Sequence, residues 1–376
     1  MNVYLGHHAS LQYLRSWSRA NPLTVRAFHE LKGYPVSLFP AAHFSTTASL
    51  ISPAFRERDI FAVLAQCDDS FLQALAIAAC NDTSAQPLAH EAPDGSSAVF
   101  PLDTLTDQAG LKNTPRLVYH RTAISHPRNS FLKIAPQVRI ESPELVFARF
   151  AAELSLGSLL ALGYELCGCY PLSDEPGVKL VRRPLTSPGR LIAFCHQLQQ
   201  APGVKLARVA AKEVRSRAAS PKEAELAITA FTSVRRGGYG LPEAKLNEPV
   251  RLSPAAAQIA RSSSVTCDIY WPNAAFALEY DGKAFHSGQM TRDSRRRDAL
   301  AIDGVEMLTI TEAQLSSVTE CATIMEHAST RTGKRVRERG PKFFPAHMAL
   351  RQGVREFHYN QRRRDNGPGI KNDDRC

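Results

Sequence analysis

The stretch at residues 267–286, "CDIYWPNAAFALEYDGKAFH", places three carboxylates in a segment whose other residues are mostly apolar. Because side chains alternate between the two faces of a strand, Asp268 faces away from both of its apolar neighbours. In the strand expected at 275–282, Glu279 and Asp281 share one face. A short turn around Asn273 joins the two strands, so we expect a hairpin that brings Asp268 and Glu279 together.

Two carboxylates held close in a medium of low dielectric repel each other, and at least one pKa rises unless a cation joins them. Mg²⁺ is a hard ion that takes oxygen ligands and usually keeps several waters. The hairpin therefore predicts a magnesium site that uses Asp268 and Glu279. A purely structural role is the alternative, but it is costly for Asp268 if that carboxylate is buried and unpaired.

The segments around the hairpin predict a mixed α and β domain. "SPKE" at 220–223 is typical of a helix start, with Ser220 as the cap and a proline in the first turn. Alternating patterns predict strands at 243–253 and 264–272 before the strand that carries Glu279. A helix at 291–304 and a strand at 305–311 follow. The expected order is one helix, three strands, one helix and one strand.

This order of elements, with these acids, resembles the PD-(D/E)xK nuclease superfamily, and more narrowly its very-short-patch-repair-endonuclease-like branch, which includes a domain of unknown function. The resemblance covers roughly residues 212–315 and implies a restriction-endonuclease-like fold. The matching positions are Glu223, Asp268, Trp271, Pro272, Glu279, Asp281, Gly282, His286, Asp293, Arg296, Leu300 and Gly304.

The resemblance also implies catalytic roles. Asp268 and Glu279 would hold Mg²⁺ or Mn²⁺, and Glu223 would reach the ion from its helix, directly or through water. The metal would polarise the scissile phosphate and lower the pKa of a bound water, giving an attacking hydroxide. His286 would orient water or assist the leaving group. A first-turn helix acid is the alternative for Glu223, and a surface histidine is the alternative for His286.

One position departs from the usual nuclease pattern. Standard members carry lysine two residues after the strand glutamate, where this chain has Asp281. The branch that the chain resembles also has aspartate there, so Asp281 is interpreted as a catalytic residue and alternative ligand, as a turn residue beside Gly282, or as a sign of lost activity. Lys283 replaces the missing lysine only if the strand continues past Gly282.

Basic side chains near the site predict contacts with DNA phosphates. The expected contacts come from Lys283, Arg295, Arg296 and Arg297. The arginine cluster also fits a solvated, salt-bridged helix face. The chain has a net charge of +10, and residues 331–376 hold 13 lysines and arginines against 5 acids. Such a basic tail displaces counterions from nucleic acid, or is simply a solvated end.

The whole chain of 376 residues is interpreted as an α+β or α/β protein with a mostly helical N-terminal region. We expect a small helical or winged-helix-like module at 1–115 and a linking domain of strands and then helices at 116–211. The nuclease-like domain follows at 212–325, and a basic, mostly disordered tail at 326–376.

Other classes of function lack their motifs. The chain has no GxxxxGK[ST] loop, no GxSxG elbow, no CxxC pair among its eight cysteines and no apolar run long enough for a bilayer. We expect a cytoplasmic Mg²⁺-dependent DNA endonuclease or nickase, compatible with a protein partner or a homodimer. The alternative is a non-catalytic DNA-binding or regulatory protein, such as one of a defence or toxin–antitoxin system.

Overall fold

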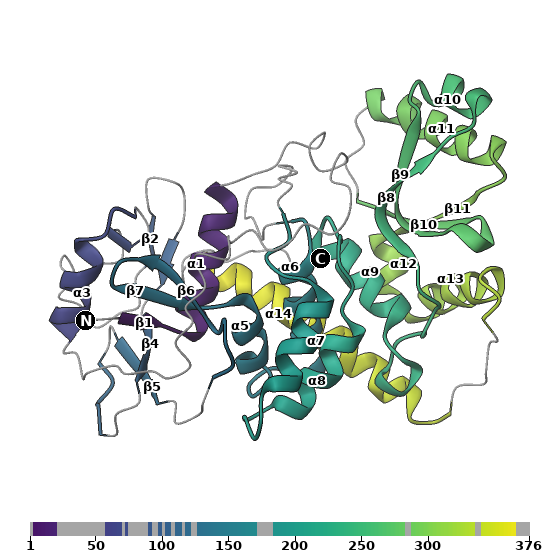
Figure 1. The fold of residues 1–376 in the computed structure, drawn as a ribbon. Helices are drawn as coiled ribbons and strands as arrows, with labels where there is room; N and C mark the ends of the chain where they lie inside the picture. The colour runs from purple at the N-terminus through teal and green to yellow at the C-terminus, as the bar shows by residue number, and fades with distance from the viewer. Residues whose placement is uncertain are drawn as a thin grey trace, which may run out of the picture.

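The computed structural model describes residues 3–20, 57–69, 72–73, 89–91, 97–99, 102–106, 110–114, 117–121, 126–170, 183–282, 287–334 and 340–365, and the statements below concern these residues. They form a mixed α/β architecture, with two mixed sheets at opposite ends and a layer of helices between them (Figure 1). The expected mixed class is confirmed. None of the described helices is both long and apolar enough to cross a membrane.

The first sheet draws strands from both predicted N-terminal domains. Its order is β5-β4-β1-β7-β6, formed by β1 (Val3–Leu5), β4 (Leu102–Thr106), β5 (Leu117–Arg121), β6 (Phe131–Ala135) and β7 (Val138–Glu141). The central strand β1 is antiparallel to β4 and parallel to β7. This sheet thus crosses the boundary predicted at residue 115 between a helical or winged-helix-like module and the linking domain. Because β1 is so short and β7 lies so far along the chain, local periodicity does not reveal their pairing.

Two helices and a strand pair accompany this sheet: α1 (His7–Ala20), α3 (Glu57–Ala65), β2 (Ala89–Glu91) and β3 (Ser97–Val99). A buried ion pair ties α1 to the helical layer, since Arg15 Nε and Nη2 each donate to Glu165 at 2.7 Å. The N-terminal strand and helix are thus integrated into the core.

The helical layer consists of α5 (Pro143–Phe150), α6 (Leu156–Cys167), α7 (Pro188–Gln197), α8 (Val204–Glu213) and α9 (Pro221–Phe231). Ser142 caps α5, because its side chain accepts the N–H of Leu145. Nearly every residue of α6 is buried, which suits a helix that is apolar on all sides.

The C-terminal segment is structured where a disordered tail was expected. After α12 (Glu312–Ser316) and α13 (Val318–Arg331), helix α14 (Phe343–Asp365) runs along α6 (Figure 1). Its residues Leu350, Val354 and Phe357 are buried at helical spacing. The prediction of a mostly disordered tail is therefore wrong for 343–365, because this apolar stripe lies between the arginines and packs into the core.

The second sheet has the predicted composition. Helix α9 is followed by β8 (Lys245–Arg251), a short additional helix α10 (Pro254–Ala260), β9 (Ser264–Trp271), β10 (Phe276–Asp281), α11 (Ser287–Ile302) and β11 (Glu306–Thr311). The strand order is β11-β10-β9-β8, with β9 antiparallel to both neighbours and β10 parallel to β11. A short 3₁₀ turn joins β9 to β10, so the predicted hairpin is confirmed.

His126, which packs against the first sheet, is expected to make the stability of the fold depend on pH. Its ring is buried edge-on to Phe131, with ring centroids 5.2 Å apart. Burial, and then the charge of Arg149, lower the pKa of His126 from 6.5 to about 4. The unfolded chain therefore takes up this proton at a higher pH than the folded chain does. The part of the folding stability that depends on neutral His126 is fully present above about pH 6.5 and is lost as the pH falls toward the pKa of His126 in the folded chain.

We therefore expect the free energy of unfolding to fall by about 2 kcal/mol between about pH 7 and pH 5 through His126 alone. Urea titrations across this range measure it. The variant His126→Gln, which does not titrate, is expected to lose this part of the pH slope. Identical slopes for the wild type and the variant would show that His126 does not control acid stability.

Candidate functional site

Glu223 lies in the first turn of α9, where capping contacts hold it. Ser220 Oγ accepts the N–H of Glu223 at 3.1 Å, and Glu223 Oε2 accepts the N–H of Ala219 at 2.8 Å. Reciprocal contacts of this kind stabilise helix N-termini. The same carboxylate oxygen accepts the Asn247 Nδ2–H at 2.7 Å. Glu223 thus has a structural role, and it joins α9 to β8.

Asp268 lies where β9 and β10 part. The paired register of these strands runs as far as Leu278 opposite Ile269, so Asp268 and Glu279 come next along the two strands. Beyond this pair, Asp268 Oδ2 accepts the backbone N–H of Tyr280 at 2.8 Å. The predicted approach of Asp268 and Glu279 thus occurs where the pairing of β9 and β10 ends (the fork: Asp268 and Glu279).

Asn247 occupies the position of β8 opposite Asp268, between the paired residues Leu246 and Glu248. Its φ of 48° lies in the left-handed region, which costs a residue other than glycine about 1 kcal/mol. Asn247 Nδ2 also donates to the Arg217 carbonyl oxygen at 2.9 Å, so this conformation is held by its surroundings. Strained backbone of this kind occurs often at functional sites, and sequence reasoning missed this residue.

Arg296 extends from α11 to the fork. Its Nη2 donates to Glu279 Oε1 at 2.7 Å and to the Thr266 carbonyl oxygen at 2.6 Å. A second ion pair, between Arg296 Nη1 and Asp293 Oδ1, is longer, at 3.7 Å. The second oxygen of Glu279, Oε2, is buried and has no hydrogen-bond partner in the part of the chain that the structure describes. One carboxylate therefore has an oxygen held by arginine and an oxygen left open.

The electrostatics of the fork favour a cation. Burial, and then the charges of Glu223 and Glu279, raise the pKa of Asp268 well above its usual value, against the opposing effects of the Tyr280 N–H and Arg296. Burial also raises the pKa of Glu279, although Arg296 acts against it. The negative charges of three carboxylates (the acid cluster: Glu223, Asp268 and Glu279) therefore repel one another.

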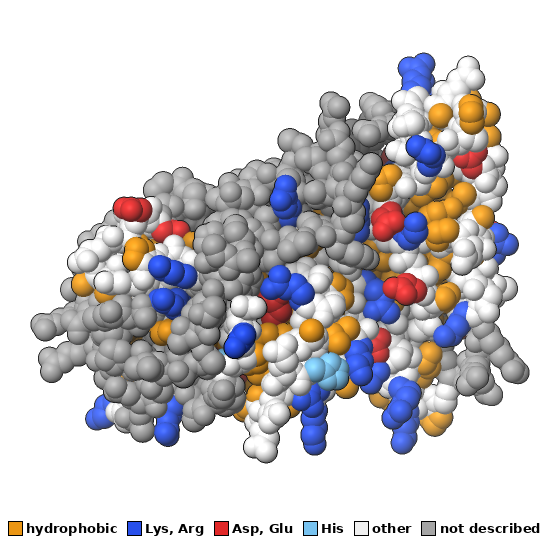
Figure 2. Space-filling view, in the orientation of Figure 1, with side chains coloured by type: hydrophobic (Ala, Val, Ile, Leu, Met, Phe, Trp, Pro, Cys, Tyr) orange, Lys and Arg blue, Asp and Glu red, His pale blue; other side chains and the backbone are white. Residues whose placement is uncertain are grey.

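The other predicted site residues have different fates. Asp281 ends β10 in an exposed position. The pKa of Tyr280 is raised mainly by burial and by the hydrogen bond to Glu312, and the charge of Asp281 adds to this rise. Arg295 is half-buried and Arg297 is exposed on α11. Lys283 and His286 lie outside the described residues. Figure 2 shows basic side chains among acidic ones on the surface over α9 and the second sheet.

The donor chemistry fits a divalent ion, but with fewer ligands than predicted. In the part of the chain that the structure describes, no three His, Cys, Asp or Glu side chains form a group able to hold a metal. Asp268 and Glu279 offer only carboxylate oxygens, one of them buried and open. Such a pair suits Mg²⁺, which is commonly held by one or two carboxylates and several waters.

A polar network connects the strand that carries Glu279 to the C-terminal helix. Tyr280 donates its hydroxyl to Glu312 Oε2 at 2.6 Å, and Lys222 Nζ donates to Glu312 at 2.8 Å and to Glu225 at 2.9 Å. Arg355 of α14 donates to Glu225 at 3.1 Å. Sequence reasoning missed this network, because its members come from segments that are far apart in the chain.

Comparisons with models of protein families, with curated proteins and with solved structures found no match for this chain.

Proposed function

We propose that residues 212–325 act as a Mg²⁺- or Mn²⁺-dependent DNA endonuclease or nickase, as the resemblance to the PD-(D/E)xK superfamily predicts. One observation carries the proposal: the half-buried Asp268 and Glu279 lie at the fork of β9 and β10, with raised pKa values and one buried, open carboxylate oxygen. This arrangement is unfavourable in an empty protein and favourable around a cation. Groups with pKa values perturbed in this way gather at functional sites.

The proposed reaction adds water to a backbone phosphorus and breaks one phosphorus–oxygen ester bond, leaving a phosphate monoester and a hydroxyl group. When bound, the ion supplies positive charge beside the phosphate and acidifies water. Asp268 and Glu279 supply its protein oxygens. Glu223 and Asn247 hold α9 and β8 together beside these oxygens, and Arg296 orients Glu279.

DNA is the proposed partner because its phosphates suit the basic side chains of the chain. Arg295 and Arg297 lie on α11, the helix that also supplies Arg296 to the fork. Lys283 remains a predicted contact. Because the chain has a net charge of +10, we expect its binding to DNA to weaken steeply as the salt concentration increases.

The ion pair between Arg296 and Glu279 favours a second candidate function. A guanidinium that neutralises Glu279 reduces the need for a metal, and Asp281 stands where the usual nuclease pattern has lysine. A DNA-binding or regulatory protein without hydrolysis, as in a defence or toxin–antitoxin system, is consistent with both features.

Plasmid nicking tests the proposal. We expect the wild type to nick supercoiled plasmid with Mg²⁺ or Mn²⁺ and not with EDTA. The variant Asp268→Asn removes one charged oxygen ligand and is expected to lower the rate about a hundredfold. The matched control is Asp298→Asn, which changes an exposed aspartate on α11 and is expected to cut like the wild type.

The outcomes separate the two functions. Equal nicking by the wild type and Asp268→Asn would assign the cleavage to a contaminant or to another site. Plasmid binding without nicking by the wild type, measured by gel shift, would favour the non-catalytic function instead.

A further inference from the structure

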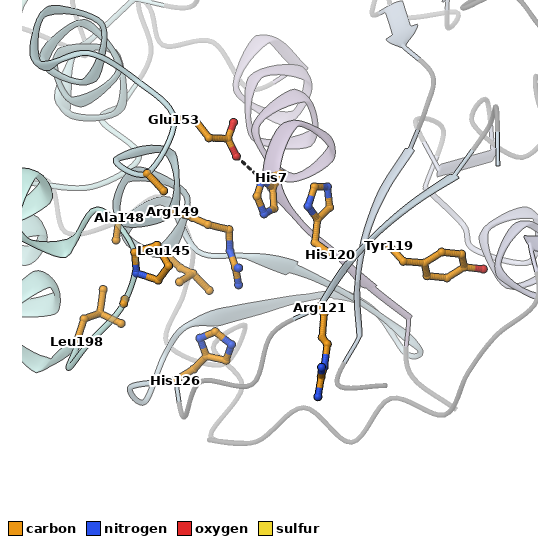
Figure 3. Close-up of a pocket in the computed structure, with 13 residues that line it drawn as sticks. His7, Tyr119, His120, Arg121, His126, Leu145, Ala148, Arg149, Glu153 and Leu198 are labelled. Atoms are coloured by element: carbon orange, nitrogen blue, oxygen red, sulfur yellow. Dashed lines mark ion pairs between the residues drawn. The ribbon is translucent and has the colours of Figure 1, made fainter. Parts of the chain in front are cut away.

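A cavity of about 410 Å³ lies between the first sheet and the helical layer (Figure 3), whereas the acid cluster lies at the second sheet. Its walls come from β5, the start of α1, helix α5 and the segment after α7. This volume lies within the range of small-molecule sites. The cavity shares no residue with the proposed nuclease site.

Two histidine rings form one polar wall. His7 and His120 stack with ring centroids 3.8 Å apart. His7 Nδ1 lies 3.4 Å from Glu153, and His120 Nε2 lies 2.6 Å from Asp103. Each ring is therefore oriented by its own carboxylate, so these acids are already engaged.

Arg149 adds a charged group. It forms an ion pair with Glu141, a fully buried carboxylate that also accepts the backbone N–H of His7 at 2.7 Å. Arg149 Nη2 is buried and has no hydrogen-bond partner among the described residues. Figure 3 shows the Arg149 side chain extending into the space between the histidines and His126. Because guanidinium has several donors in one plane, it can bind an oxyanion in addition to Glu141.

The opposite wall is apolar. Leu145, Ala148, Leu198 and Pro202 line it, and Ala201 lies beside them. A cavity with one apolar wall and a few polar groups on the other side holds an organic ligand in a fixed orientation better than it holds a bare ion.

We propose that this cavity binds a small organic oxyanion, a carboxylate or a phosphate monoester carried on a compact apolar body. The oxyanion contacts Arg149 beside the rings of His7 and His120, and the apolar body packs on Leu145 and Leu198. The polar groups available to a ligand here are hydrogen-bond donors, because the neighbouring carboxylates already pair with Arg149 or the histidines.

Calorimetric titration with phenyl phosphate and with benzoate tests the proposal and tells a phosphate ligand from a carboxylate ligand. We expect saturable binding of at least one probe to the full chain. Arg149→Lys keeps the charge but loses the planar fork, and is expected to bind at least about tenfold more weakly. Ala201→Trp fills the cavity from a half-buried position and is expected to abolish binding.

The matched control is Ala255→Trp, at an exposed alanine of α10, which is expected to bind like the wild type. Near-ultraviolet circular dichroism checks that each variant is folded. If Arg149→Lys does not fold, the comparison of Ala201→Trp with the wild type tests the proposal. Two results would overturn the proposal: no binding of either probe to the wild type at millimolar concentration, or wild-type affinity in the folded cavity variants.

Discussion

Replacing Gly157 with valine is expected to lower the free energy of unfolding by about 3 kcal/mol or more and to release α14 from α6. A Cβ atom at position 157 would overlap the carbonyl oxygen of Leu350. It would also lie 3.0 Å from the Val354 nitrogen and 3.1 Å from the Gly353 Cα. These are backbone atoms, so the clash is relieved only if the whole helix moves.

Urea unfolding measures the change in free energy, and limited trypsin digestion reports on α14. In the wild type, burial protects the arginine at 351, whereas release of α14 exposes it to cleavage. The control is Gly189→Ala on α7, where an added Cβ would meet no atom within 4 Å. That change is expected to be neutral or slightly stabilising. An unchanged unfolding curve for Gly157→Val, with α14 still protected, would mean that this close packing does not hold the helix.

The second sheet could be predicted because its signals are local. The cap at Ser220, the alternation around Asp268 and the short turn before Glu279 each act within a few residues, and the structure confirms the order of elements that they predict. The approach of Asp268 to Glu279 follows from the hairpin alone. The reaction and the metal stay predictions.

The remaining features depend on pairings between distant segments. Residues 3–5 form a strand only because β4 and β7 lie on either side of them, and no local pattern encodes this. In α14, the apolar stripe was hidden among arginines, one of which is itself buried: Arg351 donates to the carbonyl oxygens of Leu315 and Ser316. At the site, the link from Asn247 to Glu223 joins a strand to a helix.

The variant Arg296→Met is expected to destabilise the metal-free protein by about 2 kcal/mol and to make its stability depend on Mg²⁺. Breaking a buried ion pair costs about 3–5 kcal/mol, because the remaining charge is left unpaired. The expected cost is smaller here, since the side chains of Arg296 and Glu279 are 27% and 15% exposed and solvent screens them in part. Without the guanidinium, Glu279 lies beside Asp268 with no cation to offset the repulsion.

Mg²⁺ at the fork would replace that lost charge, and an ion that binds only the folded state raises its stability. Thermal unfolding midpoints in EDTA and in millimolar Mg²⁺ measure the effect. We expect a larger rise for Arg296→Met than for the wild type, in which arginine competes for Glu279. The control is the double variant Arg296→Met/Glu279→Gln, which lacks the carboxylate and is expected to be stable without metal and insensitive to Mg²⁺. If Mg²⁺ raised the midpoints of the single and double variants equally, Glu279 would not be a ligand, whether or not the protein cuts DNA. Because this measurement needs no cleavage, it separates a metal-binding fold that has lost its activity from one that never held an ion at this position.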